Sequence, residues 1–231
     1  MFALRRTTVM FLAACAALPL AASAVSLAQL TNQEASSGLK AALEQGAVAA
    51  VGKLGVENGF LANDKVRIPL PRLLEQARPI LKMTGNSKQL DELVLAMNHA
   101  AEAAVPLAKP LLVNAVKNMS VSDAKGILGG GETSVTEFFR GKTAAQLAVQ
   151  FKPIVKKVTD RSALSAQYNS AMGQAGKLGL GTAQTATVED YVTQRALDGL
   201  FTMIAEEEKA IRNDPVGTGS KLIGKVFGAL R

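Results

Sequence analysis

The chain contains one histidine, His99, so a Ser-His-Asp or Cys-His catalytic device would have to use it. On a helical wheel, His99 lies opposite the apolar stripe that contains Leu90 and Met97, on the polar face near Lys88. His99 and Glu102 stand one helical turn apart. However, helical di-iron proteins repeat a Glu-x-x-His pair on two helices, and this chain shows no such repeat. We therefore expect an exposed, solvated histidine, no catalytic residue and no metal site.

Two glutamates, Glu102 and Glu208, could act as general acids. Glu208 falls near the middle of the apolar stripe of a long helix, where a charge requires a partner. Candidate partners are arginines beside apolar residues: Arg67, Arg72 and Arg140. We favour a structural ion pair, with a hydrated helix end as another explanation. The alternative is a carboxylate-dependent hydrolase acting on an envelope polymer, with Glu102 or Glu208 as the acid.

A glycine-rich stretch, GILGGGETS at residues 126–134, is one residue away from the phosphate-binding pattern G-x-x-x-x-G-K-[ST]. The lysine position holds Glu132, which would repel phosphate, and the preceding SVSDAKGIL has a helical rather than a strand pattern. We expect a hinge instead, with left-handed glycines ending one helix and Thr133 capping the next. The stretch gives no reason to expect a nucleotide, and we expect no cofactor.

The elements that position these residues have helical periodicity almost throughout, with no confident strand and no internal repeat. Capping boxes begin at Thr31 and Thr187. We expect a bend or a restart at Pro79, a kink or a new helix at Pro106 and Pro110, and a break near Gly141. The expected fold is all-α: one compact or slightly elongated domain of about eight to ten helices, several kinked by proline. The expected helices are 31–53, 71–83, 87–104, 106–119, 121–128, 133–158 with its break, 162–177, 187–213 and 220–230.

Residues 1–24 have the pattern of a secretory signal peptide. Arg5 and Arg6 precede a short apolar run, and small residues fit a cut after Ala24, which leaves the helical domain at 25–231. We therefore expect a periplasmic or secreted protein. A lipoprotein attached through Cys15 is the minor alternative, disfavoured because only about eight residues separate Arg6 from Cys15.

Charge and composition limit the partners of the mature chain. Without the signal, 24 basic and 19 acidic residues give a net charge of +5, which is scattered and too mild for a nucleic-acid surface. Cleavage would remove the only cysteine, and no transmembrane segment is expected in the mature chain. The expected partner is an anionic lipid, another envelope component or a protein.

The C-terminal segment, SKLIGKVFGALR at residues 220–231, is strongly amphipathic. Lys221, Lys225 and Phe227 are candidates for contact with an anionic membrane. The same pattern is typical of a terminal helix that packs on its own core. We favour packing, because the segment lacks a tryptophan anchor.

Several sequence blocks together resemble an exported bacterial family called domain of unknown function 4197. They are ASSGLKAALEQGAVAAV, GFLANDKVRIPLP, NHAAEAAVPLAKPLLVNAVKNMSVSDAKGIL, TEFFRGKT and VEDYVTQRALDGLFTMIAEEEKAIRNDP. The resemblance implies a secreted or periplasmic helical domain with no established reaction, cofactor or catalytic residue. The family pattern commonly has an arginine at the position of His99, which weakens a histidine-based mechanism further.

The polar residues of these blocks form a candidate set for a ligand-binding site or a buried polar network: Arg67, Asn98, Glu102, Lys109, Asn114, Arg140, Tyr191, Asp198 and Glu208. Their density in VRIPLP, NHAAEAAVPLAKP and DYVTQRALDG leads to the hypothesis that these three segments converge. With no nucleophile–base set in view, the leading hypothesis is a non-enzymatic binding or structural protein of the cell envelope.

Overall fold

The computed structural model describes residues 32–85, 87–177 and 187–214, and all regular structure in these ranges is helical, which confirms the expected all-α class. The elements are α1 (Asn32–Leu54), α2 (Arg72–Met83), α3 (Ser87–Ala104), the 3-10 turn η2 (Val105–Leu107), α4 (Ala108–Lys117), α5 (Val121–Gly129), α6 (Ser134–Thr159), α7 (Ala163–Lys177) and α8 (Val188–Asn213).

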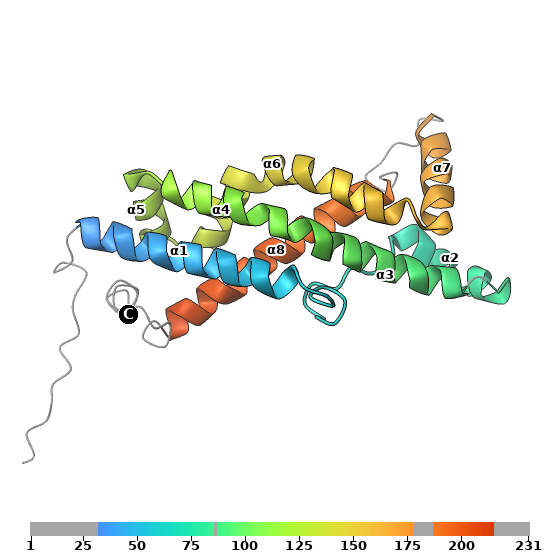
Figure 1. Cartoon of the computed structure of the whole chain (residues 1–231), viewed down its shortest axis with the longest axis horizontal. Helices are drawn as coiled ribbons and strands as arrows, with labels where there is room; N and C mark the ends of the chain where they lie inside the picture. Colours follow the sequence, from blue (N-terminus) through green and yellow to red (C-terminus); the bar gives the residue numbers. More distant parts are fainter. Residues whose placement is uncertain (1–31, 86, 178–186, 215–231) are drawn as a thin grey trace, which may run out of the picture.

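The long helices α1, α3, α6 and α8 form the body of an elongated molecule, with α4 continuing the line of α3 (Figure 1). Helix α8 packs against α1, α3, α6 and α7. At one end of the body lie α2 and α7, and at the other end lies α5 (Figure 1). Because α8 is in contact with four other helices, its buried side chains lie on several sides of the helix and not along a single stripe.

Helix α8 begins where the sequence predicts. The Thr187 hydroxyl accepts a hydrogen bond from the Asp190 N–H at 3.2 Å, as in the first half of a capping box. Farther along, α8 contributes Phe201 to a core that also holds Phe60, Phe139 and Phe151, all fully buried. Burial of each such ring stabilises the fold by about 1.5–3 kcal/mol.

Proline changes the helices less than expected. Pro106 lies in η2, between α3 and α4, so the expected kink at this proline is present. Pro79, by contrast, lies inside α2, which runs from Arg72 to Met83 without restarting. The expected break near Gly141 is also wrong, because α6 continues through it. Phe139 and Thr143 are both buried on either side of Gly141, so packing holds the helix across the glycine. The described residues form eight α-helices, which is the lower limit of the expected range of eight to ten.

The glycine-rich stretch separates α5 from α6 as a hinge, but by a different geometry from the expected one. Gly130 has φ −85° and ψ 167°, which is extended rather than left-handed backbone. Thr133 makes no capping hydrogen bond to the α6 backbone. Helix α5 instead starts with a full capping box, in which Ser120 and Asp123 each accept the other's backbone N–H at 3.0 Å.

Candidate functional site

The connection between α1 and α2, residues 55–71, is held against the bundle by two polar side chains of α3. We call it the anchored loop. Asn98 is fully buried, and its Oδ1 accepts a hydrogen bond from the Ile68 N–H at 2.8 Å. Its Nδ2 donates to the Ile68 carbonyl at 2.9 Å and to the Val94 carbonyl at 2.8 Å. The amide thus satisfies both backbone groups of Ile68, as a neighbouring strand would.

One turn after Asn98, Glu102 holds the other part of the loop. Its Oε1 accepts hydrogen bonds from the N–H groups of Phe60 at 3.0 Å and Leu61 at 3.1 Å. Its Oε2 lies 2.7 Å from Nδ1 of His99. His99 is therefore half-exposed and bound to a buried carboxylate, not a purely solvated side chain as expected. Glu102 has a structural role that uses both of its oxygens.

The anchored loop also runs along α8. Phe60 and Val66 pack so close to Gly199 that a Cβ on this glycine would lie 2.6 Å from Cε1 of Phe60. The Tyr191 hydroxyl donates a hydrogen bond to the Pro69 carbonyl at 3.1 Å. The three segments VRIPLP, NHAAEAAVPLAKP and DYVTQRALDG therefore meet in the structure, through the loop, α3 and α8 respectively.

Two arginines stack on aromatic rings of α8. The guanidinium carbon of Arg140, on α6, lies 4.6 Å from the centre of the Phe201 ring. That of Arg195, on α8, lies 5.3 Å from the centre of the Tyr191 ring. Both arginines are exposed. Cation–π contacts of this kind restrict the guanidinium orientation while leaving its N–H groups directed toward solvent.

A third exposed arginine, Arg67, lies in the anchored loop. On one side of it Val66 packs on Gly199, and on the other the Pro69 carbonyl accepts a hydrogen bond from Tyr191. We call Arg67, Arg140 and Arg195 the arginine surface. Its nearby acidic group is Asp198, which contacts Nη1 of Arg140 at 3.2 Å and accepts a hydrogen bond from Gln194 at 3.2 Å.

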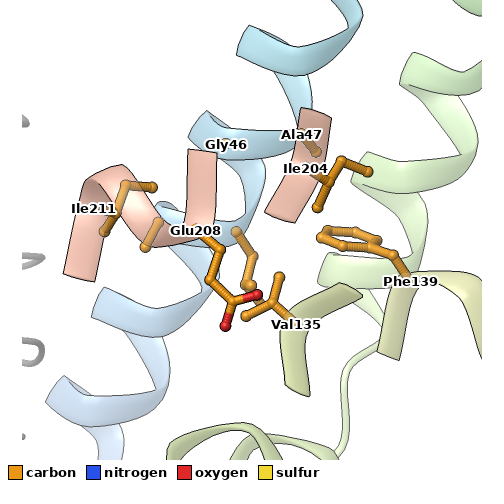
Figure 2. A pocket seen from close by; sticks show the side chains of 9 residues that line it. Gly46, Ala47, Val135, Phe139, Ile204, Glu208 and Ile211 are labelled. Carbon is orange, nitrogen blue, oxygen red and sulfur yellow. The ribbon is translucent and has the colours of Figure 1, made fainter. Parts of the chain in front are cut away.

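Glu208 lies at a second location, where the end of α8 meets the start of α6. Its carboxylate points from α8 toward Val135, into a small apolar cavity between α1, α6 and α8 (Figure 2). The cavity has a volume of only about 10 Å³, and Phe139, Ile204 and Ile211 are among its lining residues. Oε1 accepts two hydrogen bonds from Arg212, at 3.0 and 2.8 Å, whereas Oε2 is buried without a hydrogen-bond partner.

The partner of Glu208 is thus Arg212, one turn along the same helix, and the expected partners Arg67, Arg72 and Arg140 are wrong. Arg212 also donates to the Ser134 hydroxyl at 3.3 Å, which ties the end of α8 to the start of α6. Burial raises the pKa of Glu208, while Arg212 and the N–H groups of Val135 and Thr136 act to lower it. The N–H groups of Val135 and Thr136 lie near enough to the carboxylate to lower its pKa, but neither forms a hydrogen bond with Oε2.

Both candidate acids are buried and bound by other groups of the fold, whereas the hydrolase alternative needs an accessible carboxylate. Such a carboxylate should lie in an open cleft, away from any arginine. Glu208 is 5% exposed and paired with an arginine, and Glu102 is 6% exposed and bound by two backbone N–H groups. Within the described ranges, no three His, Cys, Asp or Glu side chains come together as a metal ion would require. No helix in these ranges is both long and apolar enough to span a membrane.

A family described as "Protein of unknown function (DUF4197)" matches residues 29–228. The chain belongs to the DUF4197 family. No curated protein and no solved structure matches it. The anchored loop, α3, α6 and α8 of this DUF4197 protein all lie within the matched residues.

The remaining candidate residues of the DUF4197 chain lie elsewhere. Lys109 and Asn114 are exposed on α4, where Asn114 accepts a hydrogen bond from Asn118 at 3.0 Å, so neither belongs to the network around the loop. Lys221, Lys225 and Phe227 lie outside the described residues, as do Cys15 and residues 1–24, the expected signal peptide. Sequence reasoning missed Arg195. Its i, i+4 spacing from Tyr191 on a helix is the signal that could have found it.

Proposed function

We propose that this DUF4197 protein is a non-enzymatic binding protein of the cell envelope that holds an anionic component through the arginine surface. The observation that carries the proposal is the stacking of Arg140 on Phe201 and of Arg195 on Tyr191. A guanidinium that is already stacked on a ring loses less conformational entropy when it binds a ligand than an unstacked guanidinium does. It also presents paired N–H donors that match the oxygens of phosphate and carboxylate groups.

The way the fold uses its buried acids favours binding over catalysis. Glu102 holds the anchored loop and Glu208 holds Arg212. A third buried glutamate, Glu189, accepts hydrogen bonds from Asn169 at 2.9 Å on both oxygens and so joins α7 to α8. Glu102 and Glu189 each fix one element to another, and Glu208 holds Arg212, which contacts Ser134 of α6.

The anchored loop explains how Arg67 could act together with the other two arginines. Its backbone is fixed on both sides, by Asn98 at Ile68 and by the packing of Val66 on Gly199. Asp198 is the nearby acidic group on α8, and it contacts one nitrogen of Arg140. A phosphate or carboxylate group of a lipid or polymer could bind beside it through the other guanidinium donors.

The proposal is tested by co-sedimentation of the chain from Val25 onward with phosphatidylglycerol and phosphatidylcholine vesicles. A triple variant, Arg67→Gln, Arg140→Gln and Arg195→Gln, removes the arginine surface. A matched control replaces three exposed lysines elsewhere: Lys109→Gln, Lys117→Gln and Lys157→Gln. Both variants lose the same formal charge.

We expect binding to the anionic vesicles alone, weakened at least about tenfold in the arginine variant and much less in the lysine variant. Equal losses in both variants would show a general charge effect and refute the arginine surface. A third variant that lacks 220–231 separates the contribution of Lys221, Lys225 and Phe227. If its loss equals the whole of the binding, the membrane contact belongs to the C-terminal segment and the proposal fails.

A further inference from the structure

A groove of about 270 Å³ lies between α1 and the end of α8. Small and apolar residues line its floor, namely Gly46 and Ala49 of α1 and Ala210 and Ile211 of α8. A Cβ at Gly46 would lie 3.5 Å from Cβ of Glu207 and 3.6 Å from Cδ1 of Ile211, which is ordinary van der Waals contact, so the two helices pack against each other at this point. Glu207 and Asp214 add carboxylates to the lining.

The position of the chain end suggests an occupant for this groove. Asp214, the last described residue, itself lines the groove, and residues 215–231 follow it. Residues 215–219 form a short Pro- and Gly-containing connection, and five residues reach at most about 17 Å. The amphipathic segment 220–231 therefore begins within reach of the groove. The family match extends to residue 228, so the DUF4197 pattern includes most of this segment.

The segment and the groove are complementary in chemistry. At helical spacing, Leu222, Ile223, Val226, Phe227 and Leu230 share one arc of the segment, and Lys221, Lys225 and Arg231 share the other. The apolar arc requires a cover, which the small residues of the groove floor can provide. The basic arc suits a groove lined by the carboxylates of Asp214 and Glu207, although Glu207 already binds Lys53 at 2.5 Å.

We infer that residues 220–231 pack into the groove between α1 and α8 of the same molecule. Bound in this way, the segment extends the core at the end of the bundle where α8 meets α6. Its apolar arc faces the protein, not a lipid surface. This inference is independent of the arginine surface, which involves the anchored loop and the other half of α8.

Cysteine cross-linking tests the inference in the full chain with Cys15→Ser, so that the introduced cysteines are the only thiols. Ala210→Cys places one thiol at an exposed position of the groove, and it is combined in turn with Leu222→Cys, Val226→Cys and Phe227→Cys. Ala49→Cys, on the opposite wall, provides a second series. The control series uses Val149→Cys on α6, which is 75% exposed and lies outside the groove.

After mild oxidation, we expect intramolecular disulfides in at least one pair of each groove series and none above background with Val149→Cys. Peptide mass spectrometry identifies the linked residues, and circular dichroism confirms that the variants fold. Absence of cross-links in both groove series, or equal yields with Val149→Cys, would overturn the inference. Disulfides found only between two molecules would overturn it as well, because the groove would then receive a second copy.

Discussion

Asn98 and Ile68 form a complete pair: the buried amide of Asn98 binds both the N–H and the carbonyl of Ile68, at 2.8 and 2.9 Å. The two residues lie 30 positions apart in sequence, on α3 and on the anchored loop. Ile68 is buried, so without Asn98 its two backbone groups would be left unsatisfied, which costs about 1–3 kcal/mol for each group. The side chain of Asn98 takes the place of a neighbouring strand and allows the loop to remain irregular.

Replacement of Asn98 should therefore be severe. We expect Asn98→Ala to lower the free energy of unfolding by about 3 kcal/mol, because it leaves both backbone groups of Ile68 buried and unsatisfied. Urea denaturation followed by circular dichroism measures the change. Asn114→Ala is the matched control, since Asn114 is an exposed helical asparagine, and its effect should stay within about 0.5 kcal/mol. Similar losses in the two variants would contradict the role of Asn98.

Two glycines should respond in opposite directions to the same substitution. Gly199→Ala places a Cβ 2.6 Å from the fully buried Phe60 ring, so we expect a loss of about 1–3 kcal/mol from overpacking. Gly141→Ala lies inside α6 with open space around the new Cβ, so we expect a gain of about 0.5–1 kcal/mol from helix propensity. Thermal unfolding of both variants checks the sign. Stabilisation by Gly199→Ala would mean that the loop does not approach α8 this closely.

Glu208 should make stability depend on pH. Burial raises its pKa above the ordinary value of 4.5, so the folded protein binds the proton more tightly than the unfolded chain. Stability contributed by this group is therefore present at low pH and is lost as the pH rises from the unfolded to the folded pKa. We expect the free energy of unfolding of the wild type, relative to Glu208→Gln, to fall across this window. Urea titrations at several pH values measure the difference, and a rising difference would contradict the raised pKa.

Asp123 supplies the control with the opposite sign. Hydrogen bonds from the backbone N–H and the hydroxyl of Ser120 hold the pKa of Asp123 below its ordinary value of 3.8, with Lys142 assisting. Its contribution is present above the unfolded pKa and is lost as the pH falls. The same titrations on Asp123→Asn should give a wild-type advantage that grows as the pH rises through the acid range, unlike that of Glu208.

Much of the fold follows from sequence pattern, because helical periodicity and caps are local properties. Helix α8 starts after Thr187 and ends at Asn213, as its cap and stripe predict. The positions of glycine and proline predicted helix ends less well than the caps did. Gly141 lies inside a continuous helix, since the packing of Phe139 and Thr143 outweighs a propensity cost of about 1 kcal/mol. Pro79 also lies inside a continuous helix, although Leu74 is the only buried residue of α2.

The candidate site was less predictable because its contacts are long-range. Asn98 and Glu102 could be placed on one helical face from their spacing alone. Their partners, the backbone groups of Phe60, Leu61 and Ile68, carry no side-chain signal in the sequence. The partner of Glu208 was missed for the opposite reason: Arg212 was close by, at i+4, while more distant arginines were considered.

The double attachment of the anchored loop has a consequence for how this family could vary. Surface loops usually tolerate insertions, because lengthening them costs little entropy. Here one helical turn of α3, from Asn98 to Glu102, is matched to the span between Phe60 and Ile68. One added residue within that span would put the two anchors out of register. We therefore expect length changes to accumulate at the hinge between α5 and α6, and this loop to keep a constant length.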